Sequence, residues 1–338
     1  PTLEKAINES LDYLGRIPAD RRFHFCGEKY SAAWLEESLR SFAQLMKRAT
    51  EPRKLGALIN KHFDICQVMG DSGSGRVLVT GYFEPILEAS LSKESPYLYP
   101  LYSTPPDLTY HNGGAGRWDG DSFVPYWSRA EINKGNILAG NELVYLASPI
   151  DNFILHVQGS GQVRLPDKSV RRIQYAAKNG RRYRSIGRYL VDRGKMDLEE
   201  ASLPKIRRYL EEHPAELRDI LNHNESFIFF KWGEHAENGP KGCLGEELTA
   251  GRSIALDQAY YPSGVLAFLQ TRKPLINARG EIMGWEPFSR FVLNQDSGSA
   301  IKGGGRVDLY WGSGMMAEAA AGVMKHPGKL YVLLLKKK

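Results

Sequence analysis

Apolar residues recur at helical spacing in the first part of the chain. Residues 2–15 and 33–48 each carry such a stripe, and a third stripe predicts a helix over 54–68. The segment Asp71-Ser-Gly-Ser-Gly75 then breaks the pattern, and residues 76–84 are mostly β-branched or aromatic. The chain is therefore predicted to open with helices and to change to strands near residue 76.

The middle of the chain mixes the two patterns. Prolines, glycines and aromatic residues fill 96–120, which predicts a long loop and a domain boundary. A capping box at Ser128 predicts a short helix, and further helices are predicted over 186–192 and 203–222. Strands are predicted at 142–147, 153–158, 162–165, 169–176 and 226–231.

The last third consists of short strands separated by turns, with one helix at 315–325. Many short strands with few helices between them favour a closed barrel. Since glycine-rich segments flank the middle block, we expect residues 106–240 to be a domain inserted into a barrel domain. That barrel domain would comprise residues 1–105 and 241–338, with the N-terminal helices.

Length and composition agree with an ordinary globular protein of one or two domains, since 42% of residues are hydrophobic and 25% charged. The sequence contains no run of 18 apolar residues and no signal-peptide pattern at its start. Three cysteines are widely spaced, at 26, 66 and 243. One bridge is possible, but the odd count favours three buried thiols.

The net charge of +6 is unevenly distributed. Residues 164–195 carry eleven lysines or arginines against Asp167 and Asp192. Such a segment is most often a solvated face, but it would also suit nucleic acid, an anionic membrane or an acidic polymer. Its aromatic residues are only three tyrosines, and no RNA-binding signature is present, so nucleic-acid binding is disfavoured.

Carboxylates at strand ends provide the candidate chemistry. Asp296 and Asp308 flank a glycine-rich turn that includes Lys302, and Asp257 ends another predicted strand. For a single aspartate, capping a turn or pairing with a nearby cation is the commoner role, but three such groups in one small barrel favour a shared role. The sequence lacks the calcium-loop spacing, the zinc-ligand patterns and the serine-hydrolase elbow. Acid and base catalysis of glycoside cleavage remains.

Six segments in this order resemble the membrane-bound lytic murein transglycosylase A family, within the wider three-aspartate barrel group. They are TGYFEP (80–85), PIDNFILHVQGSGQVRL (149–165), YRSIGRYLVDRG (183–194), GRSIALD (251–257), QDSGSAIKG (295–303) and VDLYWG (307–312). The sequence departs from the family at Ser297, Ser299 and the run 303–305, and neither change affects the carboxylates.

The resemblance implies a mainly β fold with helices, in which a double-psi β-barrel and a smaller inserted domain flank a groove. It implies cleavage of the β-1,4 bond between N-acetylmuramic acid and N-acetylglucosamine, giving a 1,6-anhydromuramyl end. By this resemblance Asp308 is the catalytic acid and base, and Asp296 raises its pKa or positions it. Substrate contacts are expected from Thr80, Tyr82, Glu84, Gln158, Gly159, Ser160, Asp257 and Lys302.

The resemblance also implies a setting for the protein. The partners would be peptidoglycan glycan strands and wall-synthesis proteins, on the periplasmic face of the Gram-negative outer membrane. A lipid anchor would precede the first residue of this chain. We expect no metal and no cofactor, so activity should survive chelation. The alternative is a wall-binding or scaffolding protein that has the groove but no turnover.

Overall fold

The computed structural model describes residues 2–49, 51–233 and 239–337, and these form two compact units. The first unit combines the chain up to Phe83 with the chain from Lys241 onward, and the second is Glu84–Pro240. The expected boundary near residue 105 is therefore wrong, because residues 84–105 belong to the second unit. There β5 (Ile86–Ser90) and β6 (Tyr99–Tyr102) both pair with β10 (Glu142–Leu146).

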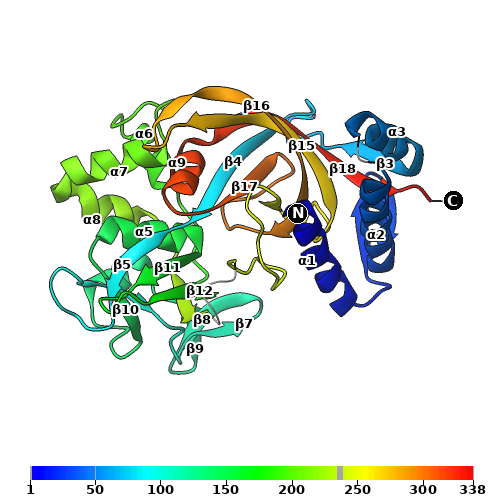
Figure 1. The fold of residues 1–338 in the computed structure, drawn as a ribbon. Helices are drawn as coiled ribbons and strands as arrows, with labels where there is room; N and C mark the ends of the chain where they lie inside the picture. The colour runs from blue at the N-terminus through cyan, green and yellow to red at the C-terminus, as the bar shows by residue number, and fades with distance from the viewer. Residues whose placement is uncertain (1, 50, 234–238, 338) are drawn as a thin grey trace. The chain divides into compact units, whose positions relative to one another are not determined.

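Six strands of the first unit close into a barrel (Figure 1). In order around it they are β15 (Leu266–Ile276), β16 (Ile282–Asp296), β14 (Ser253–Ala255), β17 (Arg306–Ser313), β4 (Val77–Glu84) and β18 (Lys325–Leu335). The ring closes where β18 pairs with β15, and β3 (Phe63–Gln67) adds a further strand beside β18. The mainly β fold with a closed barrel is thus confirmed.

The short strand β14 lies between β16 and β17, parallel to the first and antiparallel to the second. Consequently the glycine-rich segment 297–305 does not close a hairpin. It instead carries the chain from β16 to β17 past β14. This crossing places the ends of β16 and β17 on either side of one small residue, Ala255.

Helices of the first unit are α1 (Thr2–Arg16), α2 (Ala32–Arg48), α3 (Pro52–His62) and α9 (Met315–Val323). The stripe of α2 buries Leu35, Leu39 and Phe42 in the barrel's core cluster. The third helix ends at His62, earlier than predicted, because the next five residues pair with β18 as β3. Residues 63–67 fit both the helical spacing of apolar residues and the composition of a strand, and pairing with the long strand β18 makes them a strand.

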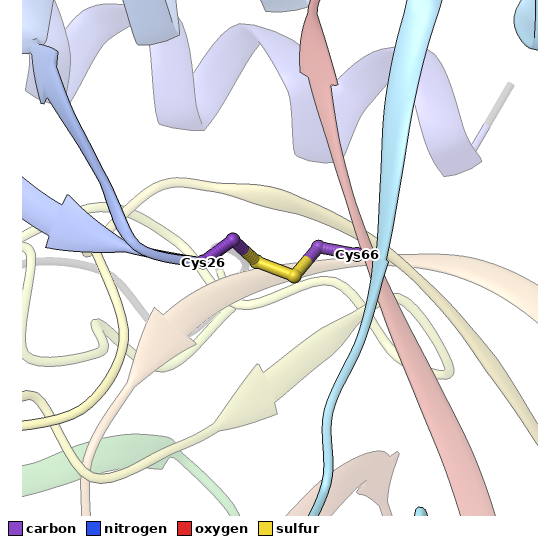
Figure 2. Close-up of a disulfide and its surroundings, with 2 residues drawn as sticks. All are labelled: Cys26 and Cys66. Atoms are coloured by element: carbon purple, nitrogen blue, oxygen red, sulfur yellow. A yellow bond between two sulfur atoms is a disulfide. The ribbon is translucent and has the colours of Figure 1, made fainter.

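A disulfide joins Cys26 to Cys66, with 6.4 Å between their Cα atoms (Figure 2). The prediction of three thiols is therefore wrong, and only Cys243 is free. Cys26 lies in the turn between β1 (Arg22–Phe25) and β2 (Glu28–Ser31), whereas Cys66 lies in β3. Loop-closure entropy over the 40 residues that separate them corresponds to about 4 kcal/mol of stabilisation.

The second unit is built on a six-stranded sheet, in which β5, β6 and β10 continue into β11 (Ser160–Arg164), β12 (Val170–Lys178) and β13 (Ile228–Trp232). A three-stranded sheet contains β7 (Thr109–His111), β8 (Gly114–Asp119) and β9 (Ser122–Pro125). The segment 96–120 is thus not the long loop that its prolines and glycines predicted. Its strands are only three to six residues long, too short to show a clear alternation.

Helices of this unit are α4 (Arg129–Lys134), α5 (Pro149–Gln158), α6 (Ile186–Asp192), α7 (Leu203–Glu212) and α8 (Pro214–His223). The predicted strand 153–158 is wrong, since these residues end α5. Ser148 caps that helix by accepting a hydrogen bond from the Asp151 amide, and Gly159 ends it with φ of 86°. Because four consecutive residues from Phe153 are buried, the helical period is not visible in the sequence.

Among the described residues, no helix combines the length and the apolar character needed to cross a membrane.

Candidate active site

The strand register brings Asp296 and Asp308 to the same level of the barrel. Ala255 in β14 is the Cα partner of Asp296 on one side and of Asp308 on the other. Since neighbouring strands lie about 4.8 Å apart, the two aspartate Cα atoms are about 10 Å apart. The two residues are twelve positions apart in the sequence, and the fold brings them to the same level on the two strands that flank β14, with Ala255 between them.

Asp308 is half-buried and has one hydrogen-bonding side chain beside it. Thr80 donates from Oγ1 to Asp308 Oδ1 over 2.7 Å, whereas Oδ2 accepts no hydrogen bond from the described residues. Burial raises the pKa of the Asp308 carboxyl to about 6; the Thr80 hydroxyl and Arg306 lower it, and Asp296 raises it. At neutral pH a useful fraction of this carboxyl is therefore protonated, and one of its oxygens can receive a ligand.

Asp296 is held much more firmly. Its Oδ2 accepts from the Tyr82 hydroxyl at 2.8 Å, and its Oδ1 accepts from the backbone amides of Cys243 at 3.0 Å and Ser297 at 2.9 Å. Burial raises the pKa of Asp296, while these three hydrogen bonds act against that rise. Because both oxygens are occupied, Asp296 is suited to orient its surroundings and to act on Asp308 through its charge.

Thr80 and Tyr82 come from β4 and hold the two carboxylates, a role that the sequence analysis did not assign to them. The Tyr82 ring also packs on Tyr310, with 5.2 Å between ring centroids. Gly81, between Thr80 and Tyr82 in the chain, leaves room for Trp311, whose Nε1 would lie 2.6 Å from a Cβ at position 81. The glycine of TGYFEP is therefore required by packing.

Asp257 supports the glycine-rich segment between β16 and β17. It is nearly buried, its Oδ2 accepts from the Gly303 amide at 2.9 Å, and its Oδ1 accepts from the Ala259 amide at 3.1 Å. Asp71 accepts in the same way from the Gly304 amide at 2.7 Å. Both oxygens of Asp257 thus hold backbone amides, and its expected contact with the substrate stays a prediction. Lys302, within this segment, is exposed.

Glu84 does not face solvent either. Its side chain is 1% exposed and forms an ion pair of 2.7 Å with Arg172, whose side chain is 2% exposed. Gln162 Nε2 donates to the other carboxylate oxygen of Glu84 at 2.9 Å. Burial and these partners give Glu84 a structural role in the second unit, and its expected contact with the substrate stays a prediction.

Gln158, Gly159 and Ser160 lie where α5 gives way to β11 in the second unit. Gln158 is the last residue of the helix, Gly159 is its left-handed cap, and Ser160 begins the strand. Their expected contact with a substrate stays a prediction. In the part of the chain that the structure describes, one cluster of three carboxylates is close enough together to hold a metal ion. It consists of Glu9, Asp12 and Glu246, and none of these is a candidate site residue.

Arg306, which lowers the pKa of Asp308, was among the cations that the sequence offered as partners for the aspartates. Sequence reasoning missed three residues of this site: Cys243 through its backbone, Tyr310 and Trp311. Two of them follow the second aspartate in the segment VDLYW, which was a signal that could have been used. For Cys243 no such signal exists, since only the fold brings residue 243 to Asp296.

Comparisons with known proteins agree with this architecture. The model of the MltA specific insert domain matches residues 78–231, and that of the 3D domain matches residues 252–334. The protein is thus of the class that combines a 3D-type barrel with an inserted second domain.

Curated relatives are more specific. The chain is 36% identical to membrane-bound lytic murein transglycosylase A of Escherichia coli K12, covering 80% of this chain and 69% of the relative. It is 35% identical to the Vibrio cholerae enzyme of the same name, covering 79% and 68%. The chain belongs to the membrane-bound lytic murein transglycosylase A family.

Solved structures show the same likeness. A membrane-bound lytic murein transglycosylase from Agrobacterium tumefaciens aligns with a TM-score of 0.80 at 29% identity, over 98% of this chain and 92% of that one. E. coli MltA with bound chitohexaose aligns with a TM-score of 0.77 at 29% identity, over 99% and 89%.

Proposed function

We propose that this protein is a lytic transglycosylase that cleaves the β-1,4 bond between N-acetylmuramic acid and N-acetylglucosamine in peptidoglycan. The observation that carries the proposal is the unequal state of the two aspartates. Asp308 combines a pKa of about 6 with an oxygen that no described residue occupies, whereas Asp296 is engaged by three donors. One carboxyl is available for proton transfer, and this reaction requires one.

The proton balance closes on Asp308. Its protonated carboxyl donates to the glycosidic oxygen as the bond from that oxygen to C1 of muramic acid breaks. The ionised carboxylate then takes the proton of the muramic C6 hydroxyl as that oxygen bonds to C1. The leaving sugar gains a hydroxyl, the muramic residue becomes its 1,6-anhydride, and Asp308 is protonated again. No water enters, in contrast to hydrolysis by two carboxylates.

The neighbours of Asp308 set its protonation. An acid must begin neutral, and burial provides that state by raising its pKa. Thr80 and Arg306 stabilise the ionised form that must appear midway. The reaction needs Asp308 neutral at its start and ionised midway. A pKa of about 6 suits both states, so the same group can give a proton and take one.

The relatives supply the substrate class. The curated relatives are named murein transglycosylases, and a solved relative contains a bound chitohexaose. We therefore propose glycan strands as the ligand, with Gln158, Gly159, Ser160 and Lys302 as further contacts. The relatives are called membrane-bound, and we propose attachment at the periplasmic face of the outer membrane.

Replacing Asp308 by Asn tests the assignment. General acid and base catalysis is worth about 10²–10⁴-fold, and here one group serves both steps, so release of muropeptides from purified sacculi should fall by at least that factor. The melting temperature and the affinity for chitooligosaccharides should remain near those of the wild type. A variant that still digested sacculi at near the wild-type rate would refute the role of Asp308. A wild-type protein that bound sacculi without any release would support a scaffolding protein.

A further inference from the structure

The proposed glycan chemistry does not use the basic segment 164–195. In the structure many of its cations have structural partners. Arg172 is buried against Glu84, Arg164 pairs with Glu88 at the surface, and the guanidinium of Arg171 lies 3.7 Å from the ring centroid of Trp232. Three further arginines gather around one hollow of the second unit.

We define the arginine pocket as the hollow lined by Arg182, Tyr183, Arg184, Arg188, Tyr189 and His223, with a volume of about 320 Å³. Since one molecule of liquid water occupies about 30 Å³, the pocket has room for a group of roughly ten heavy atoms. Asp192 also lines it and pairs with Arg188 at 2.8 Å. Arg184 pairs with Glu225 at 3.0 Å.

Arg182 gives the pocket its unbalanced charge. It is exposed, and no acidic side chain pairs with it in the described ranges. Burial is the main cause that lowers the pKa of His223; Arg184 and Arg193 add to it, and Glu225 and Asp192 oppose it. The His223 ring stacks on Tyr189, with 4.2 Å between centroids, so the wall beside the arginines is a flat and rigid aromatic surface.

A second, apolar hollow of about 120 Å³ adjoins the arginine pocket and shares Tyr183 and Ser185 with it. Phe153, Ile186 and Leu210 are among the side chains that line it. A ligand at Tyr183 would therefore have guanidinium groups on one side and aliphatic side chains on the other. Guanidinium groups bind carboxylates through strong, often bidentate hydrogen bonds, so a carboxylate beside a methyl group matches both surfaces.

We infer that the second unit binds the peptide stem of peptidoglycan, with a stem carboxylate in the arginine pocket and an alanine-type side chain in the apolar hollow. This inference rests on the proposed function, because only that function makes peptidoglycan the substrate. The catalytic aspartates act on the sugar chain, and the arginine pocket recognises the peptide that the chain carries.

The test is binding of a soluble stem tetrapeptide, measured by titration calorimetry at low and high salt. Binding does not require turnover, so its outcome is independent of the glycosidic chemistry. Arg182→Gln should weaken binding about 5-fold, and Arg182→Gln with Arg188→Gln about 20-fold, as expected for solvent-accessible charge pairs. The matched control is Arg164→Gln, which removes the same charge from an exposed ion pair of the same unit outside the pocket.

Two further measurements sharpen the result. Amidation of the peptide carboxylates should abolish the difference between wild type and Arg182→Gln, and increased salt should weaken the binding of the wild type. Equal affinity in wild type, Arg182→Gln and Arg164→Gln would overturn the inference, as would the absence of binding. Weaker binding of Arg182→Gln to phosphatidylglycerol vesicles, with peptide binding unchanged, would also overturn it and assign the pocket to a membrane surface.

Discussion

Replacing Thr80 by Val should change the pH dependence of the reaction in a defined direction. The Thr80 hydroxyl donates to Asp308 over 2.7 Å and stabilises the ionised carboxylate. A hydrogen bond to a charged group is worth about 1.5–3 kcal/mol, and one pKa unit corresponds to about 1.4 kcal/mol. Because the hydroxyl also interacts with the neutral acid, a net rise of about 1 unit in the pKa of Asp308 is expected.

The sign follows from the role of the acid. The reaction begins with protonated Asp308, so activity is lost as the pH rises through its pKa, about 6 in the wild type. A higher pKa moves this alkaline limb upward. Thr80→Val should therefore keep a larger share of its maximal rate at pH 7–8 than the wild type does, even if the maximal rate is lower.

The assay is the rate of release of soluble muropeptides from sacculi across pH 4–9, each profile scaled to its own maximum. Thr80→Ser keeps the donor and should keep the wild-type profile. Thr271→Val makes the same change elsewhere in the barrel, where the hydroxyl donates to the Pro327 carbonyl at 3.2 Å, and should also keep it. A limb of Thr80→Val that stays in place or moves to lower pH would refute the reasoning.

Asp296→Asn should move the alkaline limb in the opposite direction, since it removes a negative charge that raises the pKa of Asp308. The same pH series measures it, and an upward shift would contradict the electrostatic role. Glu84→Ala should lower the free energy of unfolding by about 3–5 kcal/mol in urea titrations, because it removes the carboxylate that pairs with the buried Arg172 guanidinium. Glu88→Ala breaks only an exposed pair and should cost less than about 1 kcal/mol. A Glu84→Ala variant of normal stability with a raised KM would support the substrate contact that the sequence suggested.

The fold was predictable where its signals are local. The stripe of the second helix, the capping box at Ser128 and the strand before Pro85 all depend on residues within one turn or one strand, and the structure contains each of them. The errors share one physical origin, which is tertiary context. Residues 153–158 form a helix whose sides are mostly buried, and 63–67 form a strand because β18 offers an edge to pair with.

The site was predictable in its chemistry but not in its connections. Asp296 and Asp308 stand out because they flank a glycine-rich turn. Their convergence on Ala255 required the crossing of β14, which no local pattern reveals. Glu84 shows the reverse, because the segment TGYFEP suggests an accessible carboxylate there. In the structure its side chain is buried and pairs with Arg172, 88 positions away. The bridge between Cys26 and Cys66 was hidden by the same kind of separation.

Digestion of sacculi in ¹⁸O-labelled water, followed by mass analysis of the muramic ends, tests the central claim most directly. If Asp308 takes the proton of the C6 hydroxyl while that oxygen attacks C1, each new muramic end is a 1,6-anhydride without ¹⁸O. Such an end is lighter by one water than a hydrolysed end. Reducing muramic ends that carry ¹⁸O would contradict the account, because they would show that water attacks C1 and that a second carboxylate, such as Asp296, activates it.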